Sequence, residues 1–503
     1  MQSLKDALAA QQQQIEQLRQ ELQQRDQAWQ QAQQQLQQAQ SSAAEAQQKA
    51  AAVQASADEQ KSTVTKLSSD VADVQTTLTN TALNTQDDQK RFSALEGLVG
   101  RFRFNGDIRV RGESFFQDNV ADRNRARLRV RFGFDGKLNE DFTAGLWVST
   151  GSLGDPTSTN TTMTNFFEKH TIGLDRAFVT YNPKAAKWLS LTSGKFPYTW
   201  TRSPYSFDSD LNPEGFSQKF SFDIKSNVVK NFTFMAMQLL FNESGGGTDS
   251  YALGGQVSTK LQMGPWTMTP SFSLLKWNNI DAILAANAFA VQATSSGTPP
   301  IQVPGEGPGC GRGGPSVPPC IFAANGLTNA IVTDAGGARH FYSQYNYADV
   351  IWNNQFKTPW ARFPLVIVGE YLNNLDAQDH PLDSTGAVLT DLGSQSQAYG
   401  VDISIGQTRN KNDIQLGYAW LRQEQDSVIA SFNESDQRAP TNILQNKIYV
   451  NWKLRSNIVA GYTYFFGRTL NTNLQNAARS AGVAVGAEDA MLHRMQFDLI
   501  YTF

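Results

Sequence analysis

The sequence predicts an all-β transmembrane antiparallel barrel of about 16 strands, preceded by a long N-terminal α-helical coiled coil. Three observations support this fold class. The spacing of apolar residues changes from a heptad to strict alternation near Gly100. The final segment, from His493 to Phe503, alternates apolar and polar side chains. The segments between predicted strands are short and long in turn, as in membrane barrels.

The predicted coiled coil covers residues 1–99, where apolar residues recur at steps of four and three without a change of phase. The steps run through Leu4, Leu8, Ile15, Leu18, Leu22, Trp29, Leu36, Val53, Val64, Leu67, Val71, Val74, Leu78, Phe92, Leu95 and Val99. At about 1.5 Å per residue the rod would be roughly 140 Å long. Polar seam residues at Gln11, Arg25 and Gln60 would weaken the coil but set its register. A disordered or single-helix segment is the alternative, because Gln-rich tracts are often disordered.

The barrel is expected over residues 100–503, where the apolar period is two. Predicted strands are 102–115, 123–138, 142–150, 171–181, 188–196, 219–225, 232–241, 251–262, 266–277, 345–356, 361–372, 398–407, 414–422, 444–454, 458–466 and 493–503. Every second connection is short, whereas the others reach more than sixty residues between Trp277 and His340. A soluble β-sandwich has no reason to keep its long loops at one end, and no repeated motif suggests a β-propeller.

The final strand places Met495, Phe497, Leu499, Tyr501 and Phe503 on one face. Lipid outside and water inside a barrel would produce this pattern, although an ordinary amphipathic edge strand is the alternative. A terminal Phe503 resembles the signal that the barrel-assembly machinery reads in bacterial outer-membrane barrels. The expected location is therefore the bacterial outer membrane, with lipid as a partner and the coil in the periplasm.

Composition excludes several classes of function. The net charge of −3 indicates no nucleic-acid partner, and 2 Cys and 4 His are too few for a convincing metal cluster. No nucleophile elbow, phosphate loop or zinc-protease motif is visible, so we expect neither an enzyme nor a cofactor. Met1 leads directly into a polar helix, so an exported chain would start after a cleaved signal peptide or at an engineered start.

Arginines alternate along the first two predicted strands. They are Arg103, Arg109, Arg111, Arg123, Arg125, Arg127, Arg129 and Arg131. Each guanidinium facing lipid near mid-membrane would cost about 2–4 kcal/mol, so this set should face the lumen as one basic wall. The wall would attract anions or form a transverse field at a constriction. Alternatively Asp107, Glu113 and Asp135, or a folded-in acidic loop, neutralise it, and both interpretations can hold.

The connection after the fifth predicted strand is rich in aromatic residues and ends in Asp208-Ser-Asp-Leu-Asn-Pro-Glu-Gly215. With Gly194-Lys195 and Trp200, this segment resembles the bacterial "putative porin" family, distantly related to phosphate-selective porins. Over about residues 100–503 the resemblance implies a trimeric, 16-stranded passive diffusion channel whose third long loop folds inward. The expected constriction-loop residues are Lys195, Trp200, Arg202, Asp208, Asp210 and Glu214. Phosphate selectivity does not carry over, because the basic residues of those relatives cannot be aligned here.

Two smaller motifs have structural alternatives. Asp208, Asp210, Asn212 and Glu214 alternate oxygen ligands as calcium loops do, but lack the full twelve-residue pattern, so a polar turn is the alternative. Cys310 and Cys320 lie in the longest loop and predict a disulfide that pins it, with a redox role as the rival.

The sequence therefore predicts an outer-membrane diffusion channel for small hydrophilic solutes and ions, with a weak preference for anions. The coil should assemble a homotrimer. The main alternative is a tether whose coiled coil binds peptidoglycan or another periplasmic partner, with the pore secondary. A trimeric adhesin would supply only a few strands per chain, and an outer-membrane enzyme is a further alternative.

Overall fold

A computed structural model describes residues 64–71, 102–118, 120–153, 155–163, 167, 169–243, 248–284 and 328–503. The chain divides into two compact units, Met1–Gly97 and Leu98–Phe503. In the first unit residues 64–71 are helical, and the rest of the predicted coiled coil lies outside the described residues. Cys310 and Cys320, predicted to form a disulfide, also lie outside them. No helix among the described residues is long and apolar enough to span a membrane.

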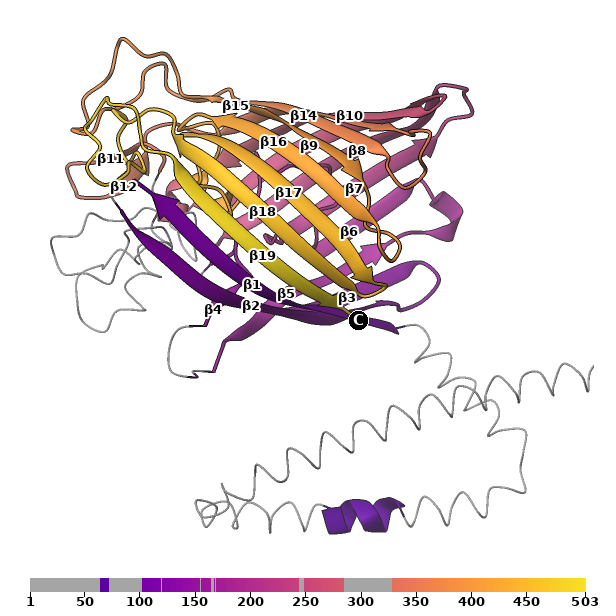
Figure 1. Cartoon of the computed structure of the whole chain (residues 1–503). Helices are drawn as coiled ribbons and strands as arrows, with labels where there is room; N and C mark the ends of the chain where they lie inside the picture. Colours follow the sequence, from indigo (N-terminus) through magenta and orange to yellow (C-terminus); the bar gives the residue numbers. More distant parts are fainter. Residues whose placement is uncertain are drawn as a thin grey trace, which may run out of the picture. The chain divides into compact units, whose positions relative to one another are not determined.

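The second unit is a closed antiparallel barrel (Figure 1). Its strands are β1 (Phe102–Gln117), β2 (Val120–Lys137), β3 (Phe142–Thr150), β5 (Ile172–Tyr181), β6 (Leu189–Lys195), β7 (Glu214–Asp223), β8 (Val229–Asn242), β9 (Ser250–Met263), β10 (Trp266–Asn278), β13 (Asn346–Phe356), β14 (Leu365–Asn374), β15 (Gln397–Gly406), β16 (Ile414–Gln423), β17 (Ile443–Arg455), β18 (Ile458–Thr469) and β19 (Leu492–Thr502). The sheet has 17 strands, and without the two-residue β4 (Thr161–Thr162) beside β2 the barrel has 16. The predicted strand number is confirmed.

The barrel closes where β19 pairs with β1, from Asp107 opposite Thr502 to Phe116 opposite His493. Beyond this ladder, Phe503 and Gly106 exchange two backbone hydrogen bonds of 3.0 Å. The Phe503 ring covers Gly106 so closely that an added Cβ would lie 2.4 Å from it. A side chain at Gly106 would therefore push the terminal aromatic residue away from the closing seam.

One predicted strand is substantially displaced. β7 begins at Glu214 instead of residue 219, because its first residues pair with β6, with Glu214 opposite Lys195. The first half of β7 offers few apolar side chains, so alternation alone missed it. Glu214 and Gly215, the last two residues of the acidic motif, therefore belong to strand β7 of the barrel wall.

The connections differ between the two ends of the barrel. Those at one end comprise residues 138–141, 182–188, 224–228, 264–265, 357–364, 407–413 and 456–457. The opposite end carries the longest connections, but also the tight one between β1 and β2 and a seven-residue one, 243–249, between β8 and β9. The connection between β10 and β13 includes the hairpin of β11 (Ile331–Thr333) and β12 (Arg339–Phe341).

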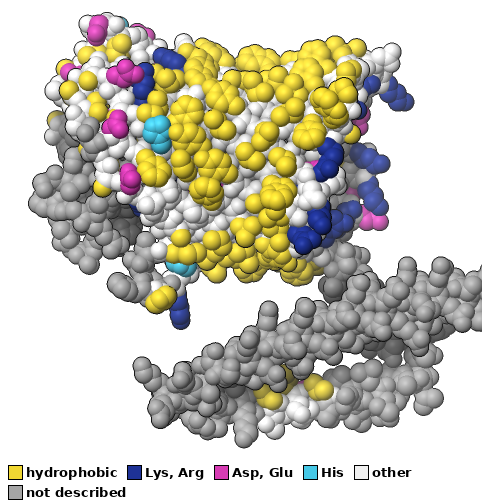
Figure 2. Space-filling view, viewed as in Figure 1, with side chains coloured by type: hydrophobic (Ala, Val, Ile, Leu, Met, Phe, Trp, Pro, Cys, Tyr) yellow, Lys and Arg dark blue, Asp and Glu magenta, His cyan; other side chains and the backbone are white. Residues whose placement is uncertain are grey.

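The outer face of the strands is apolar. Figure 2 shows a broad hydrophobic band across the visible side of the barrel, with Lys and Arg gathered at the end of the short turns. Exposed side chains on the closing strands include Ile108, Val110, Phe132, Phe497, Leu499 and Tyr501. This surface suits lipid.

Candidate functional site

The arginines of β1 and β2 occupy alternating, inward-facing positions. The register places Arg109 opposite Arg129 and Arg111 opposite Arg127, while Glu113 faces Arg125. Their neighbours Ile108, Val110 and Phe132 are exposed on the outer face. Two arginines directly opposite one another repel, so this wall needs compensating carboxylates nearby.

Carboxylates on the wall itself supply part of that compensation. Asp107 accepts from Arg129 at 2.7 Å and from Arg131 at 2.8 Å. Glu113 accepts from Arg125, and from Arg494 of β19 at 2.6 Å. These pairs are largely buried, so the ionised carboxylates are held by short charge-assisted hydrogen bonds.

Strand β19 extends the wall with residues that sequence reasoning did not single out. Both carboxylate oxygens of Asp498 accept hydrogen bonds from Arg111, at 2.7 and 2.8 Å. Arg494 and Arg111 also reach Asp436, at 2.8 and 2.7 Å, which belongs to the loop between β16 and β17. Because a closed barrel makes the first and last strands neighbours, the polar parity of the terminal strand was a usable signal for Arg494 and Asp498.

Loops cover part of the arginine wall. In the β3–β5 connection, Asn160 accepts from Arg109 at 2.5 Å and Ser158 accepts from Arg127 at 3.2 Å. Asp210 of the β6–β7 loop contacts Arg131 at 3.4 Å and Thr159 at 2.7 Å. Asp210 therefore brings this loop into direct contact with the arginine wall.

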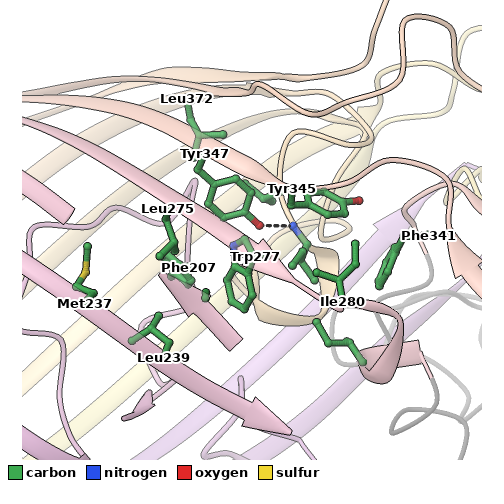
Figure 3. Close-up of a cluster of buried hydrophobic side chains, with 14 of the residues drawn as sticks. Phe207, Met237, Leu239, Leu275, Trp277, Ile280, Phe341, Tyr345, Tyr347 and Leu372 are labelled. Atoms are coloured by element: carbon green, nitrogen blue, oxygen red, sulfur yellow. Dashed lines mark hydrogen bonds between the residues drawn. The ribbon is translucent and has the colours of Figure 1, made fainter. Parts of the chain in front are cut away.

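The β6–β7 loop, residues 196–213, packs its aromatic side chains against the opposite inner wall. It contributes Phe196, Trp200 and Phe207 to a buried cluster, which Figure 3 shows in part. The strand partners are Met235, Met237, Leu239, Ala252, Leu275, Trp277, Tyr347, Leu372 and Ala398, from β8, β9, β10, β13, β14 and β15. The close-packed cluster leaves this side of the lumen closed by side chains.

Polar contacts fix the same loop at several points. Gln256 of β9 accepts from the Thr201 amide at 2.9 Å and donates to the Thr201 carbonyl at 2.8 Å. At the loop tip, Tyr205 donates to the carbonyl of Trp420 in β16 at 3.4 Å. Its ring lies over Gly400, where an added Cβ would come 3.0 Å from the ring. The loop thus contacts β2, β9 and β16, on well-separated parts of the wall.

A second loop, residues 424–442 between β16 and β17, also folds inward and was not predicted. Val428 and Ile429 join the aromatic cluster, and the Ile429 amide donates to the Tyr347 hydroxyl at 2.7 Å (Figure 3). Asp426 accepts from Ser343 at 2.6 Å and thereby ties the loop to the β10–β13 connection. Its run of four acidic residues, Glu424, Asp426, Glu434 and Asp436, was the available signal.

The two inward loops share an acidic contact. Asp208 accepts from the Ser435 amide at 2.6 Å, and its own amide donates to the Phe432 carbonyl at 2.9 Å. Burial and then the neighbouring Glu434 raise the pKa of Asp208 well above its usual range. Burial and then Asp436 raise the pKa of Glu434 to about 7. Burial opposes ionisation of Asp436 too, but Arg111 and Arg494 hold its pKa well below the usual range.

The remaining predicted loop residues disperse among separate partners. Lys195 and Glu214 pair across β6 and β7 at 3.1 Å, and Arg202 donates to the Phe207 carbonyl at 3.0 Å. Asn212 binds Arg176 and Asp175, each at 2.9 Å. The four residues of the calcium-like alternation therefore contact different neighbours, and no group of three metal-binding side chains occurs within the described ranges.

Cavities among the described residues include two that adjoin the inner wall of the barrel. The first, of about 330 Å³, lies between the tips of the two inward loops and the wall formed by β14 to β19 and β1. Its lining includes Tyr205, Glu434, Asp402, Lys447 and Tyr449. The second, of about 430 Å³, lies near the C-terminal Phe503 and is also lined by Asp107, Arg131, Trp147 and Arg176.

Comparison with known proteins gives a family match. A family model described as "Putative porin" matches residues 114–468. No curated protein matches the chain. Solved structures similar to it include OprB of Pseudomonas putida, at 10% identity and a TM-score of 0.45 over 81% of this chain and 96% of that one. An anion-selective porin from Comamonas acidovorans matches at 12% identity and a TM-score of 0.40, over 80% of this chain and 99% of that one. A loop L8 deletion mutant of OmpT, an outer membrane protein of Vibrio cholerae, matches at 10% identity and a TM-score of 0.39, over 80% of this chain and 99% of that one.

Proposed function

Because the chain belongs to the family described as "Putative porin", and is thus a porin channel of the bacterial outer membrane, we propose that small hydrophilic solutes diffuse through its lumen past an inward constriction loop. The observation that carries this proposal is the position of residues 196–213. Their contacts reach β2 through Asp210 and β16 through Tyr205. Family membership supports a channel rather than an enzyme.

The proposed route runs along β14 to β19 and β1. The aromatic cluster occupies the lumen beside β8 to β14, and the β3–β5 connection covers Arg109 and Arg127. The cavity of about 330 Å³ adjoins the strands that this packing leaves free. Solutes would then pass between the tips of the two inward loops and the wall at Asp402, Lys447 and Tyr449.

We propose a weak preference for anions. Most of the wall charge is cancelled at close range, by Asp107, Glu113 and Asp498 on the strands and by Asp210 and Asp436 on the loops. Arg109, however, contacts the neutral oxygen of Asn160. Its remaining positive charge would favour anions, but burial behind loops keeps most ions at a distance where salt screens it.

The assembly we propose is a homotrimer with a periplasmic coiled coil over residues 1–99. The heptad and its continuity to Val99 support it, and Phe503 is the proposed signal for the barrel-assembly machinery. A mass measurement of detergent-extracted protein should give three chains. Binding of the protein to peptidoglycan sacculi, lost when residues 1–99 are removed, would support the cell-wall partner.

The experiment that tests channel function is a planar-bilayer recording of the purified full chain in KCl. Discrete conductance steps are expected, with a reversal potential slightly on the anion side under a salt gradient. Protein that inserts and is fully folded, yet gives no ion conductance, would contradict the proposal.

A further inference from the structure

The cavity beside Lys447 and Tyr449 combines ring faces with polar side chains that are already paired. Tyr449 donates its hydroxyl to Asp402 at 2.7 Å, and Lys447 binds the other Asp402 oxygen at 3.2 Å. The Lys447 ammonium also lies 4.8 Å from the centre of the Tyr449 ring. Asp402, Lys447 and Tyr449 therefore form one connected group on the wall, which we term the β15–β17 triad.

The other cationic group of the cavity is paired as well. Arg111 binds Asp498 in a bidentate manner and Asp436 at 2.7 Å. A zwitterionic or ionic solute would have to displace one of these pairs before it could use the charge, and a desolvated charge left behind is costly. The paired groups can still offer hydrogen bonds to a neutral solute.

Amide and aromatic side chains complete the lining. The Gln445 amide oxygen accepts from the Arg438 backbone, and the Gln496 amide nitrogen donates to Glu113 at 2.8 Å. Each amide has a second polar atom, so Gln445 can still donate and Gln496 can still accept. Tyr205 of the loop and Phe465 of β18 add apolar surface to the same cavity.

From these contacts we propose that this cavity is a weak binding site for uncharged, polyhydroxylated solutes of sugar size. Sugar hydroxyls both donate and accept, which matches a lining of amides, internally paired ions and the Glu434 carboxyl. The C–H faces of a sugar ring suit Tyr205, Tyr449 and Phe465. The volume, about 330 Å³, is at the lower end of the range of small-molecule sites. The site would slow such solutes on the route, and this inference rests on the proposed channel function.

The test is the block of single-channel KCl current by sucrose, compared with tetraethylene glycol at matched viscosity and with the zwitterion glycylglycine. Sucrose should lower the conductance several-fold more strongly than either control solute. Lys447→Met and Tyr449→Leu should each raise the half-blocking sucrose concentration several-fold. Lys453→Met is the matched control, because Lys453 lies on the same strand and parity, about 20 Å farther along, and outside the cavity.

The outcomes separate this inference from the channel function. Equal block by sucrose and tetraethylene glycol, or stronger block by glycylglycine, overturns the sugar site while leaving the porin function intact. The sugar site is likewise overturned if the half-blocking sucrose concentration of Lys447→Met equals that of the unmodified protein. This substitution removes a charge without removing a ring. Absence of any KCl conductance would instead contradict the porin function itself.

Discussion

The lumen has two walls that hold the inward loops by different physics. On β1, β2 and β19, buried arginines bind carboxylates at 2.6–2.8 Å, including Asp436 of a loop. On β8 to β14, loop residues Phe196, Trp200 and Phe207 pack against apolar strand residues. The ionic wall fixes geometry through directional contacts, whereas the apolar wall gains from the area it removes from water. In this lumen the apolar contact closes one side, while the ionic contact shapes the other.

The largest expected effect comes from deleting Thr199 to Asp210, which removes most of the loop that bridges the two walls. Single-channel conductance should rise several-fold, and bulkier sugars should pass, because this loop crosses the lumen between β2 and β16. The measurement is conductance and liposome swelling. An unchanged conductance in a correctly folded deletion variant would mean that residues 196–213 do not narrow the pore.

A second change disturbs the apolar side alone. Trp277→Ser removes a ring whose centre lies 6.3 Å from the centre of the Phe207 ring. The same ring stacks on Phe432, with 5.4 Å between the ring centres. Loss of a buried Trp typically costs about 3–5 kcal/mol, here spread over loop docking and barrel stability. We expect noisier, larger currents with frequent transitions. Trp352→Ser is the control on a neighbouring strand, because Trp352 is exposed on the outer face; comparable noise in both variants would argue against loop release.

The loop tip offers a smaller perturbation. Gly400→Leu places atoms where the Tyr205 ring now lies, within 3.0 Å of an added Cβ, and close to the Trp420 carbonyl. The tip should move away from β15, and the cavity beside it should change in size. A conductance change of less than about twofold is expected. The control Gly393→Leu, at a position with open space around it, should leave conductance unchanged.

The ionic wall is tested through selectivity. Replacing Arg125, Arg127 and Arg129 by Ser should shift the reversal potential modestly toward cations, and the shift should shrink near molar salt, where screening falls to roughly 3 Å. The effect is limited because these arginine side chains are buried, which keeps the passing ions at a distance. If no shift occurs at low salt, the remaining charge does not reach the passing ions.

The smallest effect concerns Glu434, whose pKa is raised to about 7. With this pKa, the carboxyl should be mostly neutral below pH 7 and mostly charged above it. Because Glu434 lines the cavity, this change of charge should act on the passing ions. Raising the pH from 6 to 8 should therefore move the reversal potential slightly toward cations. Glu434→Gln should remove this dependence, whereas Glu488→Gln, a control on an exposed loop, should keep it. A pH dependence that survives Glu434→Gln would assign the titration to another group.

The contrast between the walls also explains what the sequence could reveal. Alternating charge predicted the face of the arginines, because a guanidinium such as Arg127 cannot face lipid at low cost. The strand number followed from alternation and loop length, which are local properties. On β8 and β10 the apolar residues do not indicate which face is inside, because Met237 on the inner face and Phe234 on the outer face are both apolar. Nothing local distinguishes the wall that receives Trp200 and Phe207.

Contacts that form when the barrel closes or when a loop folds inward could not be predicted from the pattern of the sequence either. Asp498 lies 387 positions from its partner Arg111, and Asp436 lies 325 positions away. The loop that carries Asp436 was interpreted only as a long connection. Asp402, Lys447 and Tyr449 meet because β15, β16 and β17 are adjacent and Gly417 leaves room for the Tyr449 ring between them. That arrangement depends on register, which composition does not specify.

The most direct test of the proposed route compares one cysteine on each side of the lumen, in a background with Cys310 and Cys320 replaced by Ser. Ala419→Cys lies in the cavity beside β15–β19, and Ala252→Cys lies in the aromatic cluster. A charged methanethiosulfonate reagent added during a bilayer recording should reduce single-channel conductance through Ala419→Cys and leave Ala252→Cys unaffected. Block at Ala252→Cys with none at Ala419→Cys would place the permeation route on the other side of the lumen and contradict the account.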